Sequence, residues 1–160
     1  MMSAQAQFYP WHDKQKHQLM QLRTAEKLPH ALLLSGPAWL GKQDFALATA
    51  AMLLCETPRD GMPCGDCPGC HLMAAGTHSD FRLIEPEDSR LIKIEQVRDL
   101  IEWVNQTPQR GGYKVVVVHP AESMNVNSAN AMLKCLEEPT DRTLIMLVSD
   151  LPGRLLPTIR

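Results

Sequence analysis

The order of apolar and polar segments along the chain predicts strands that alternate with helices. Four short runs rich in apolar or β-branched residues are typical of strands, at residues 30–35, 80–85, 114–118 and 143–149. Segments rich in helix-forming residues lie before and between them, at residues 12–27, 42–54, 71–75, 94–105 and 125–138. Strands joined by helices need crossover connections, so the pattern predicts an α/β fold with a mostly parallel sheet flanked by helices.

A glycine-rich segment follows the first predicted strand and precedes the helix expected at residues 42–54. Its sequence, Gly-Pro-Ala-Trp-Leu-Gly-Lys-Gln, matches the phosphate-loop pattern G-x-x-x-x-G-K-[ST] except at the last position. In a complete loop, backbone N–H groups surround the phosphates, the lysine neutralises them, and the Ser/Thr hydroxyl binds Mg²⁺. An amide is bulkier than a hydroxyl and a poorer magnesium ligand, so we expect a degenerate loop with weak nucleotide binding at most. Its residues are Gly36, Gly41, Lys42 and Gln43. The pattern leaves open whether ATP and Mg²⁺ bind there.

A second requirement for ATP hydrolysis is also missing. A working site of this kind has an acidic pair at the end of a neighbouring strand, which supports Mg²⁺ and polarises the attacking water. Here the strand Lys114–Val118, whose β-branched residues predict burial on both faces, runs into His119 and Pro120. Glu122 comes three residues after His119, and we expect it to point elsewhere. Two separate defects therefore predict a chain with no ATPase activity and no catalytic residue of its own.

Four cysteines predict a structural zinc site. Thiolates at C-x2-C spacing can hold one metal ion from a tight turn, and here two such pairs share their middle cysteine. The predicted ligands are Cys55, Cys64, Cys67 and Cys70. Four thiolates leave no position for water, and a metal would hold in place the Pro- and Gly-rich segment at residues 56–69, so we expect a zinc-binding insert at about 55–71. A redox pair or unrelated buried thiols are the alternatives. His71 is expected to be a helix residue beside the site, and Cys135 a small core residue.

Composition limits the remaining function classes. A chain of 160 residues predicts a single globular domain. Its formal charge of −2 gives no broad positive field, so we expect weak or no autonomous DNA binding. No apolar run approaches the roughly 20 residues that span a bilayer, and the N-terminal residues lack a basic start followed by an apolar segment. A cytoplasmic protein is expected, in which five cysteines indicate metal or thiol chemistry rather than disulfides.

One further motif carries a family resemblance. The segment Ser-Ala-Asn-Ala-Met-Leu-Lys-Cys-Leu-Glu-Glu-Pro at residues 128–139 resembles the signature of bacterial clamp-loader subunits, which have an AAA+ ATPase fold. With the cysteine cluster and residues 30–34, 76–80 and 112–118, the likeness covers nearly the whole chain and is greatest to the delta-prime subunits of the DNA polymerase III clamp loader. It implies a P-loop NTPase (AAA+) domain over residues 1–160, with the lid and C-terminal collar domains absent from this chain.

The resemblance also implies a role. Motor subunits of this family, called gamma or tau, keep the hydroxyl and the acidic pair, whereas delta-prime subunits have typically lost them and act as a fixed stator. Gln43 and His119-Pro120 follow the second pattern, although Gly41-Lys42 is retained. The implied partners are the gamma or tau and delta subunits, with the sliding clamp and primed DNA reached through the complex. Members usually continue into Ser-Arg-Cys, which is absent here, so Arg160 is not given the arginine-finger role. Ser149 falls near the position that senses the γ-phosphate in active relatives.

Three other functions remain to be tested. A motor ATPase would hydrolyse ATP by itself, and a zinc-based nucleic-acid-binding module would bind DNA tightly with a steep salt dependence. An unrelated phosphate-loop domain with a zinc insert would make the motif at residues 130–139 an accident.

Overall fold

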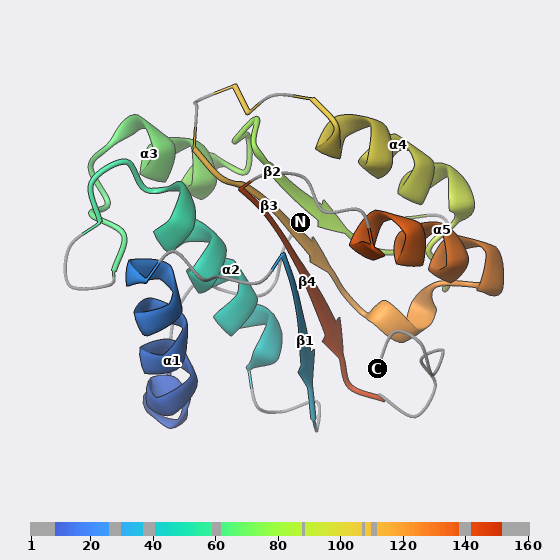
Figure 1. Ribbon diagram of the computed structural model, residues 1–160, viewed down its shortest axis with the longest axis horizontal. Helices are drawn as coiled ribbons and strands as arrows, with labels where there is room; N and C mark the ends of the chain where they lie inside the picture. Colours follow the sequence, from blue (N-terminus) through green and yellow to red (C-terminus); the bar gives the residue numbers. More distant parts are fainter. Residues whose placement is uncertain are drawn as a thin grey trace.

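The computed structural model describes residues 9–25, 30–36, 41–58, 62–87, 89–106, 108–109, 112–137 and 142–151. Its elements follow each other as predicted, with strands and helices in alternation from β1 onward (Figure 1). They are η1 (Pro10–His12), α1 (Asp13–Thr24), β1 (Ala31–Ser35), α2 (Lys42–Leu54), α3 (Pro68–Ala75), β2 (Phe81–Ile84), α4 (Ile94–Val104), β3 (Lys114–Val118), η3 (Ala121–Ser123), α5 (Val126–Glu137) and β4 (Thr143–Ser149).

The strands form one parallel sheet in the order β1-β4-β3-β2. β4 therefore lies between β1 and β3, although it is the last of the described strands in the sequence. In the register of the sheet, Ser35 at the end of β1 is opposite Ser149 at the end of β4. The carboxyl ends of all strands meet at one edge, which is where open parallel sheets bind ligands. The prediction of a parallel α/β fold is confirmed.

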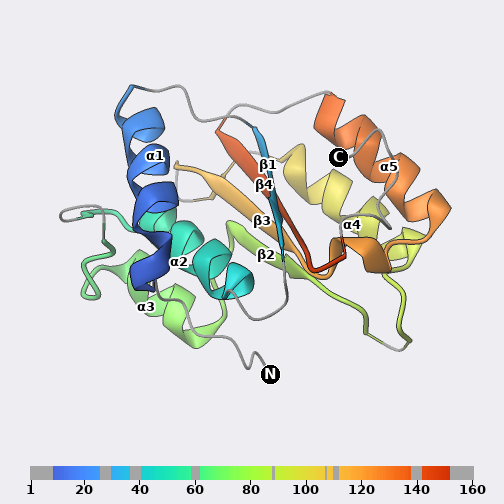
Figure 2. The same ribbon diagram turned by 90° about the horizontal axis from the view of Figure 1, so that it is seen from below.

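Helices cover both faces of the sheet, and Figure 2 shows the sheet between the two layers. Val115 and Val117 of β3 pack in the apolar cluster that contains α2, whereas Val116 and Val118 pack in the cluster with α4 and α5. All four valines are fully buried, which explains why β3 has no polar face. Each buried side chain of this size stabilises the fold by roughly 1.5–3 kcal/mol.

Helix α2 is apolar around nearly its whole circumference, and its neighbours explain why. One side packs on the sheet, and α1 and α3 lie near its other sides (Figure 1). Met20 of α1 and Met73 of α3 are packed against the same apolar cluster as α2. Helix α1 is itself polar and buries only Leu19. The helices next to α2 thus keep its side chains out of water.

One predicted boundary was wrong. Helix α3 begins at Pro68, not at His71, so part of the segment expected to be irregular is helical. Cys67 caps the helix by accepting a hydrogen bond from the backbone N–H of Cys70, and Pro68 occupies the first helical position, where its missing N–H is harmless. The composition of the segment concealed a helix start.

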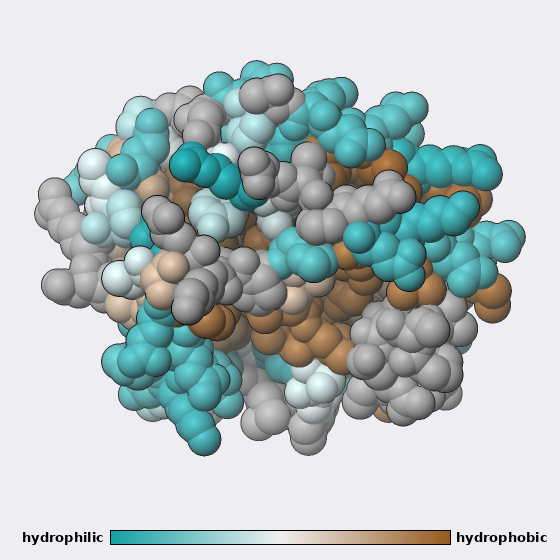
Figure 3. Space-filling model, viewed as in Figure 1, coloured by the Kyte–Doolittle hydropathy of each residue, from teal (hydrophilic) through white to brown (hydrophobic). Residues whose placement is uncertain are grey.

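The surface over β1 and β4 is apolar. Figure 3 shows brown side chains there, between the polar surfaces of α1 and of α5. In the part of the chain that the structure describes, β1 is the outermost strand on its side of the sheet, and its residues Ala31–Leu34 are only half-buried. No helix in the described ranges is both long and apolar enough to cross a membrane.

Candidate functional site

The predicted phosphate loop joins the end of β1 to the start of α2. Gly36 and Gly41 both have positive φ angles, of 145° and 70°, which side-chain-bearing residues rarely adopt. A Cβ atom at Gly41 would also lie 2.8 Å from the ring of Tyr9. Both glycines are therefore needed for the backbone path. Residues 37–40 lie outside the described residues, so the course of the loop between the glycines stays a prediction.

Lys42, the first residue of α2, has its amino group within an ion pair. Its Nζ donates a hydrogen bond to the carbonyl oxygen of Gly36 at 2.8 Å and lies 2.7 Å from Oδ1 of Asp150. The lysine side chain is 8% exposed and that of Asp150 30%. Asp150 follows β4, and the pairing of β4 with β1 brings it to the phosphate loop. Asp150 was not among the predicted site residues, because no local pattern connects it with Lys42.

The end of β3 lies next to this ion pair. Nε2 of His119 is 3.7 Å from Oδ2 of Asp150, and Oε2 of Glu122 accepts a hydrogen bond from the backbone N–H of Asp150 at 3.3 Å. The expectation that Glu122 points elsewhere was wrong. The short turn η3 brings its carboxylate back to the end of β4, which sequence spacing did not reveal. Ser149 is buried, and its Oγ accepts a hydrogen bond from the backbone N–H of Leu151 at 3.2 Å.

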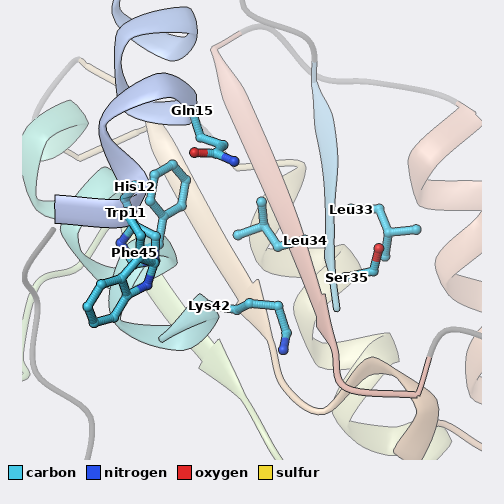
Figure 4. Close-up of a pocket in the computed structure, with 8 residues that line it drawn as sticks. All are labelled: Trp11, His12, Gln15, Leu33, Leu34, Ser35, Lys42 and Phe45. Atoms are coloured by element: carbon cyan, nitrogen blue, oxygen red, sulfur yellow. The ribbon is translucent and has the colours of Figure 1, made fainter. Parts of the chain in front are cut away.

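A cavity of about 390 Å³ opens beside Lys42. Figure 4 shows Trp11, His12 and Phe45 grouped on one side, with Leu34 of β1 facing them and Lys42 at the end near the loop. The remaining lining residues are Gln15, Leu33 and Ser35. A cavity with apolar walls and one charged group at its end is typical of sites for small molecules.

Trp11 and His12, which precede α1, form the aromatic wall together with Phe45 of α2. The rings of Tyr9 and Trp11 are stacked with centroids 4.7 Å apart, and the ring of His12 contacts that of Phe45 edge-on at 5.1 Å. The hydroxyl of Tyr9 donates to Oδ2 of Asp44, in the first turn of α2, at 2.7 Å. This segment therefore lies across the start of α2. Sequence analysis missed it, because an isolated Tyr-Pro-Trp-His run has no established chemistry.

The second candidate site is formed by the four predicted cysteines. Their sulfur atoms all lie within 4.8 Å of one another. Sγ of Cys64 is 3.9 Å from that of Cys70, and Sγ of Cys67 is 3.8 Å from that of Cys55. Four sulfurs bound tetrahedrally to one zinc ion at about 2.3 Å would lie about 3.8 Å apart. The spacing of the thiols therefore fits a zinc ion, and all five cysteines of the chain are free.

Backbone N–H groups surround the sulfur atoms. Cys64 N donates to Sγ of Cys55 at 3.2 Å, and Gly65 N donates to Sγ of Cys70 at 3.3 Å. Hydrogen bonds from the Thr57 side chain and from the Asp66 backbone lower the pKa of Cys64 to about 6. Burial raises the pKa of Cys70 to about 12. The backbone N–H groups that donate to the sulfur atoms favour the thiolate, which is the form in which cysteine binds a metal.

Close packing against α2 positions the cluster. A Cβ atom at Gly69, in the first turn of α3, would lie 2.5 Å from the carbonyl oxygen of Leu54 at the end of α2. The N–H of Gly69 also donates to Oε2 of Glu56 at 3.0 Å. Cys55 caps the end of α2 and Cys70 lies in α3, so the close approach of the two helices brings these two cysteines together.

His71 and Cys135 lie outside the cluster of four cysteines. His71 is an exposed residue of α3 whose ring does not belong to the cysteine cluster. Cys135 is buried in α5 within the apolar cluster of α4 and α5, and burial raises its pKa. The prediction that Cys135 is a core residue is confirmed.

Comparison with known proteins now identifies the family. The family model described as "DNA polymerase III, delta subunit" matches residues 11–160. The chain belongs to this family. The resemblance to the delta-prime subunits is confirmed as well, and the interpretation as an unrelated phosphate-loop domain was wrong, because the match extends through the motif at residues 130–139.

Relatives of this DNA polymerase III family cover the chain almost completely. The DNA polymerase III subunit delta' of Pseudomonas aeruginosa is 50% identical over 97% of this chain and 47% of its own length. The subunit of the same name from Escherichia coli is 37% identical over 96% of this chain and 46% of its own length. The chain thus spans about half the length of these relatives.

A relative named tau matches over a shorter range. DNA polymerase III subunit tau of Escherichia coli is 36% identical over 83% of this chain and 20% of its own length. Among solved structures, a gamma subunit-related protein of DNA polymerase III from Thermotoga maritima superimposes with a TM-score of 0.63 at 25% identity. That superposition covers 89% of this chain and 42% of the other. The α/β fold is therefore shared across the delta-prime and gamma-type proteins.

Proposed function

We propose that this chain is the N-terminal, AAA+-type part of a non-catalytic clamp-loader subunit of DNA polymerase III. In this role it acts as a rigid stator in a ring with gamma or tau and delta subunits, which loads the sliding clamp on primed DNA. The family match and the delta-prime relatives support the assignment to the clamp loader. The lid and the collar of such a subunit would lie in sequence beyond this chain.

The sequence after β3 and the pairing of Asp150 carry the stator role. The acidic pair that should follow β3 is replaced by His119 and Pro120, and the carboxylate of Asp150, which follows β4, is paired with the loop lysine. A carboxylate held by Lys42 is not free to position Mg²⁺ or to polarise a water molecule. Gln43 stands where a magnesium-binding hydroxyl is required. Each of these features removes a group that hydrolysis needs.

The cysteine cluster is proposed to hold a structural zinc ion. Cys55, Cys64, Cys67 and Cys70 would bind it as thiolates, and the ion would crosslink the end of α2 to the start of α3. The backbone N–H donors described above orient the sulfurs toward one another. Because all four positions are taken by sulfur, the metal has no role in catalysis.

The test of the stator role uses the assembled clamp loader. Lys42→Ala in this subunit is compared with the same change at the loop lysine of the motor subunit, and clamp- and DNA-stimulated ATP hydrolysis is measured. We expect Lys42→Ala here to leave the rate within about twofold, and the motor variant to abolish it. Assembly of each variant into the complex is checked by gel filtration. Loss of ATP hydrolysis with Lys42→Ala in this subunit would favour the motor function, to which the tau relative also points.

A further inference from the structure

The amino group of Lys42 already has anionic and polar acceptors from its own chain. Oδ1 of Asp150 lies 2.7 Å from Nζ, and the carbonyl oxygen of Gly36 accepts a hydrogen bond from it at 2.8 Å. The distance to Asp150 is that of a charge-assisted hydrogen bond, about 2.7–2.9 Å, which is also the distance at which a phosphate oxygen would bind. The carboxylate of Asp150 thus takes up part of the donor capacity of Lys42 that a phosphate would need.

We propose that Asp150 acts as a built-in anion that keeps nucleoside polyphosphates out of the cavity beside Lys42. The inference rests on the proposed function in one respect, namely that the phosphate loop is degenerate. It adds a second cause of weak phosphate binding, which lies outside the loop. Gln43 removes a magnesium ligand, whereas Asp150 cancels the charge that would attract phosphate. The cavity itself remains of a size that small ligands use, about 390 Å³.

Charge explains the effect. With Asp150 in place, the pair has no net charge, so a polyphosphate gains little from approaching Lys42. To bind Lys42 directly, a phosphate must displace the carboxylate, which then remains near the incoming negative charges. The side chain of Asp150 is only 30% exposed, so water does not screen this repulsion completely. His119, 3.7 Å away, and the hydrogen bond of the Asp150 N–H to Glu122 hold the residue in place.

A second contact acts in the same direction at the start of α2. Backbone N–H groups at a helix start attract anions, but here the first turn contains the carboxylate of Asp44. The Tyr9 hydroxyl holds that carboxylate, and the Tyr9 ring lies against Gly41. Both contacts lower the anion affinity of the loop, and Asp150 adds a direct contact with the lysine.

The experiment measures binding of ATP and of inorganic tripolyphosphate to the purified chain by calorimetry, with and without Mg²⁺. Asp150→Asn is compared with Asp99→Asn, which removes the same charge from an exposed position on α4. We expect Asp150→Asn to tighten binding of both ligands about tenfold and Asp99→Asn to change it by less than about twofold. Adding Lys42→Met to Asp150→Asn should remove the gain.

Two results would overturn the inference. One is an Asp150→Asn variant that binds no more tightly than Asp99→Asn, and the other is a gain that survives Lys42→Met. Should Asp150→Asn be too unstable for calorimetry, its melting temperature is measured with tripolyphosphate. The rise must then exceed that of the wild-type chain, and an equal rise contradicts the proposal. ATP hydrolysis by the wild-type chain would instead contradict the proposed function, so the two failures can be told apart.

Discussion

Lys42 and Asp150 form an ion pair with Nζ and Oδ1 2.7 Å apart, although they are far apart in the sequence. Lys42 begins the helix after β1, and Asp150 follows β4, the strand that pairs with β1. The strand order therefore places a carboxylate on the lysine of the phosphate loop. This contact gives Lys42 an anionic partner within its own chain.

The pair should show measurable coupling in stability. In a double-mutant cycle with Lys42→Met and Asp150→Asn, we expect a coupling free energy of about 1–2 kcal/mol, between the values of exposed and buried pairs. Asp150→Asn alone should cost more than Lys42→Met alone, because the lysine is the more buried partner and keeps its charge. Urea unfolding of the four proteins measures this. Additive effects, within about 0.3 kcal/mol, would show that the contact contributes nothing.

Metal content should depend on the four clustered cysteines. The purified chain is expected to contain one equivalent of zinc, and Cys64→Ser should lower that content strongly, because one of four thiolates is lost. Cys135→Ser is the control, since Cys135 lies on α5 in the apolar core and not in the cysteine cluster. Elemental analysis by mass spectrometry gives the content. Equal zinc in both variants would exclude the proposed site.

Chelation should loosen the insert and leave the sheet folded. Residues 56–69 contribute few side chains to the two apolar clusters, whereas β3 and β4 are buried throughout. Hydrogen exchange after treatment with a strong chelator should therefore increase at residues 55–70 and stay low in β3 and β4. Protection lost uniformly over the whole chain would mean that the metal holds the complete fold.

Gly69→Ala should disturb the metal site through backbone contact. The added methyl group would lie 2.5 Å from the carbonyl oxygen of Leu54, so α3 must move away from α2. We expect a loss of about 1–3 kcal/mol in stability and weaker zinc binding. Gly112→Ala is the matched control, because a Cβ atom there would meet nothing within 4 Å. Competition with a metal indicator measures zinc affinity, and similar affinities for the two variants would contradict the packing argument.

Helix α5 offers a test of the core on a single element. Met132 is fully buried, whereas Val126 is 63% exposed. Met132→Ala should cost about 2–5 kcal/mol, because it leaves a cavity against α4 and the sheet. Val126→Ala should stay within about 0.5 kcal/mol of the unmodified chain. Thermal unfolding of the two variants measures these losses in stability. A larger loss for Val126→Ala than for Met132→Ala would contradict the burial pattern.

DNA binding by the chain alone should be weak. The formal charge of −2 gives no broad positive field for DNA phosphates. A titration with primed DNA should therefore give little binding at low salt and at moderate salt. Tight binding that falls steeply with salt would instead support the zinc-based nucleic-acid-binding alternative.

Several elements were predicted correctly because the sequence signals that specify them are local. Helix α2 and strands β3 and β4 begin and end at the predicted residues. In each, the type of residue alone was enough: helix formers without Gly or Pro in α2, and β-branched or apolar runs in the strands. The start of α3 was missed, because Cys67 acts as a cap only when its sulfur faces the N–H of Cys70.

The sequence by itself determined which residues can carry chemistry here: a lysine after two glycines, a missing acidic pair, and four cysteines at metal-binding spacing. Only the tertiary structure decided what those residues meet. It put Asp150 on Lys42, turned Glu122 toward the end of β4, and set Tyr9 against Gly41. The physical reason is the distance along the sequence over which each signal acts. Composition and spacing act over a few residues, whereas the contacts of Asp150 depend on the strand order of the sheet, which places β4 between β1 and β3. The contact of Tyr9 depends on how the segment before α1 packs on the start of α2.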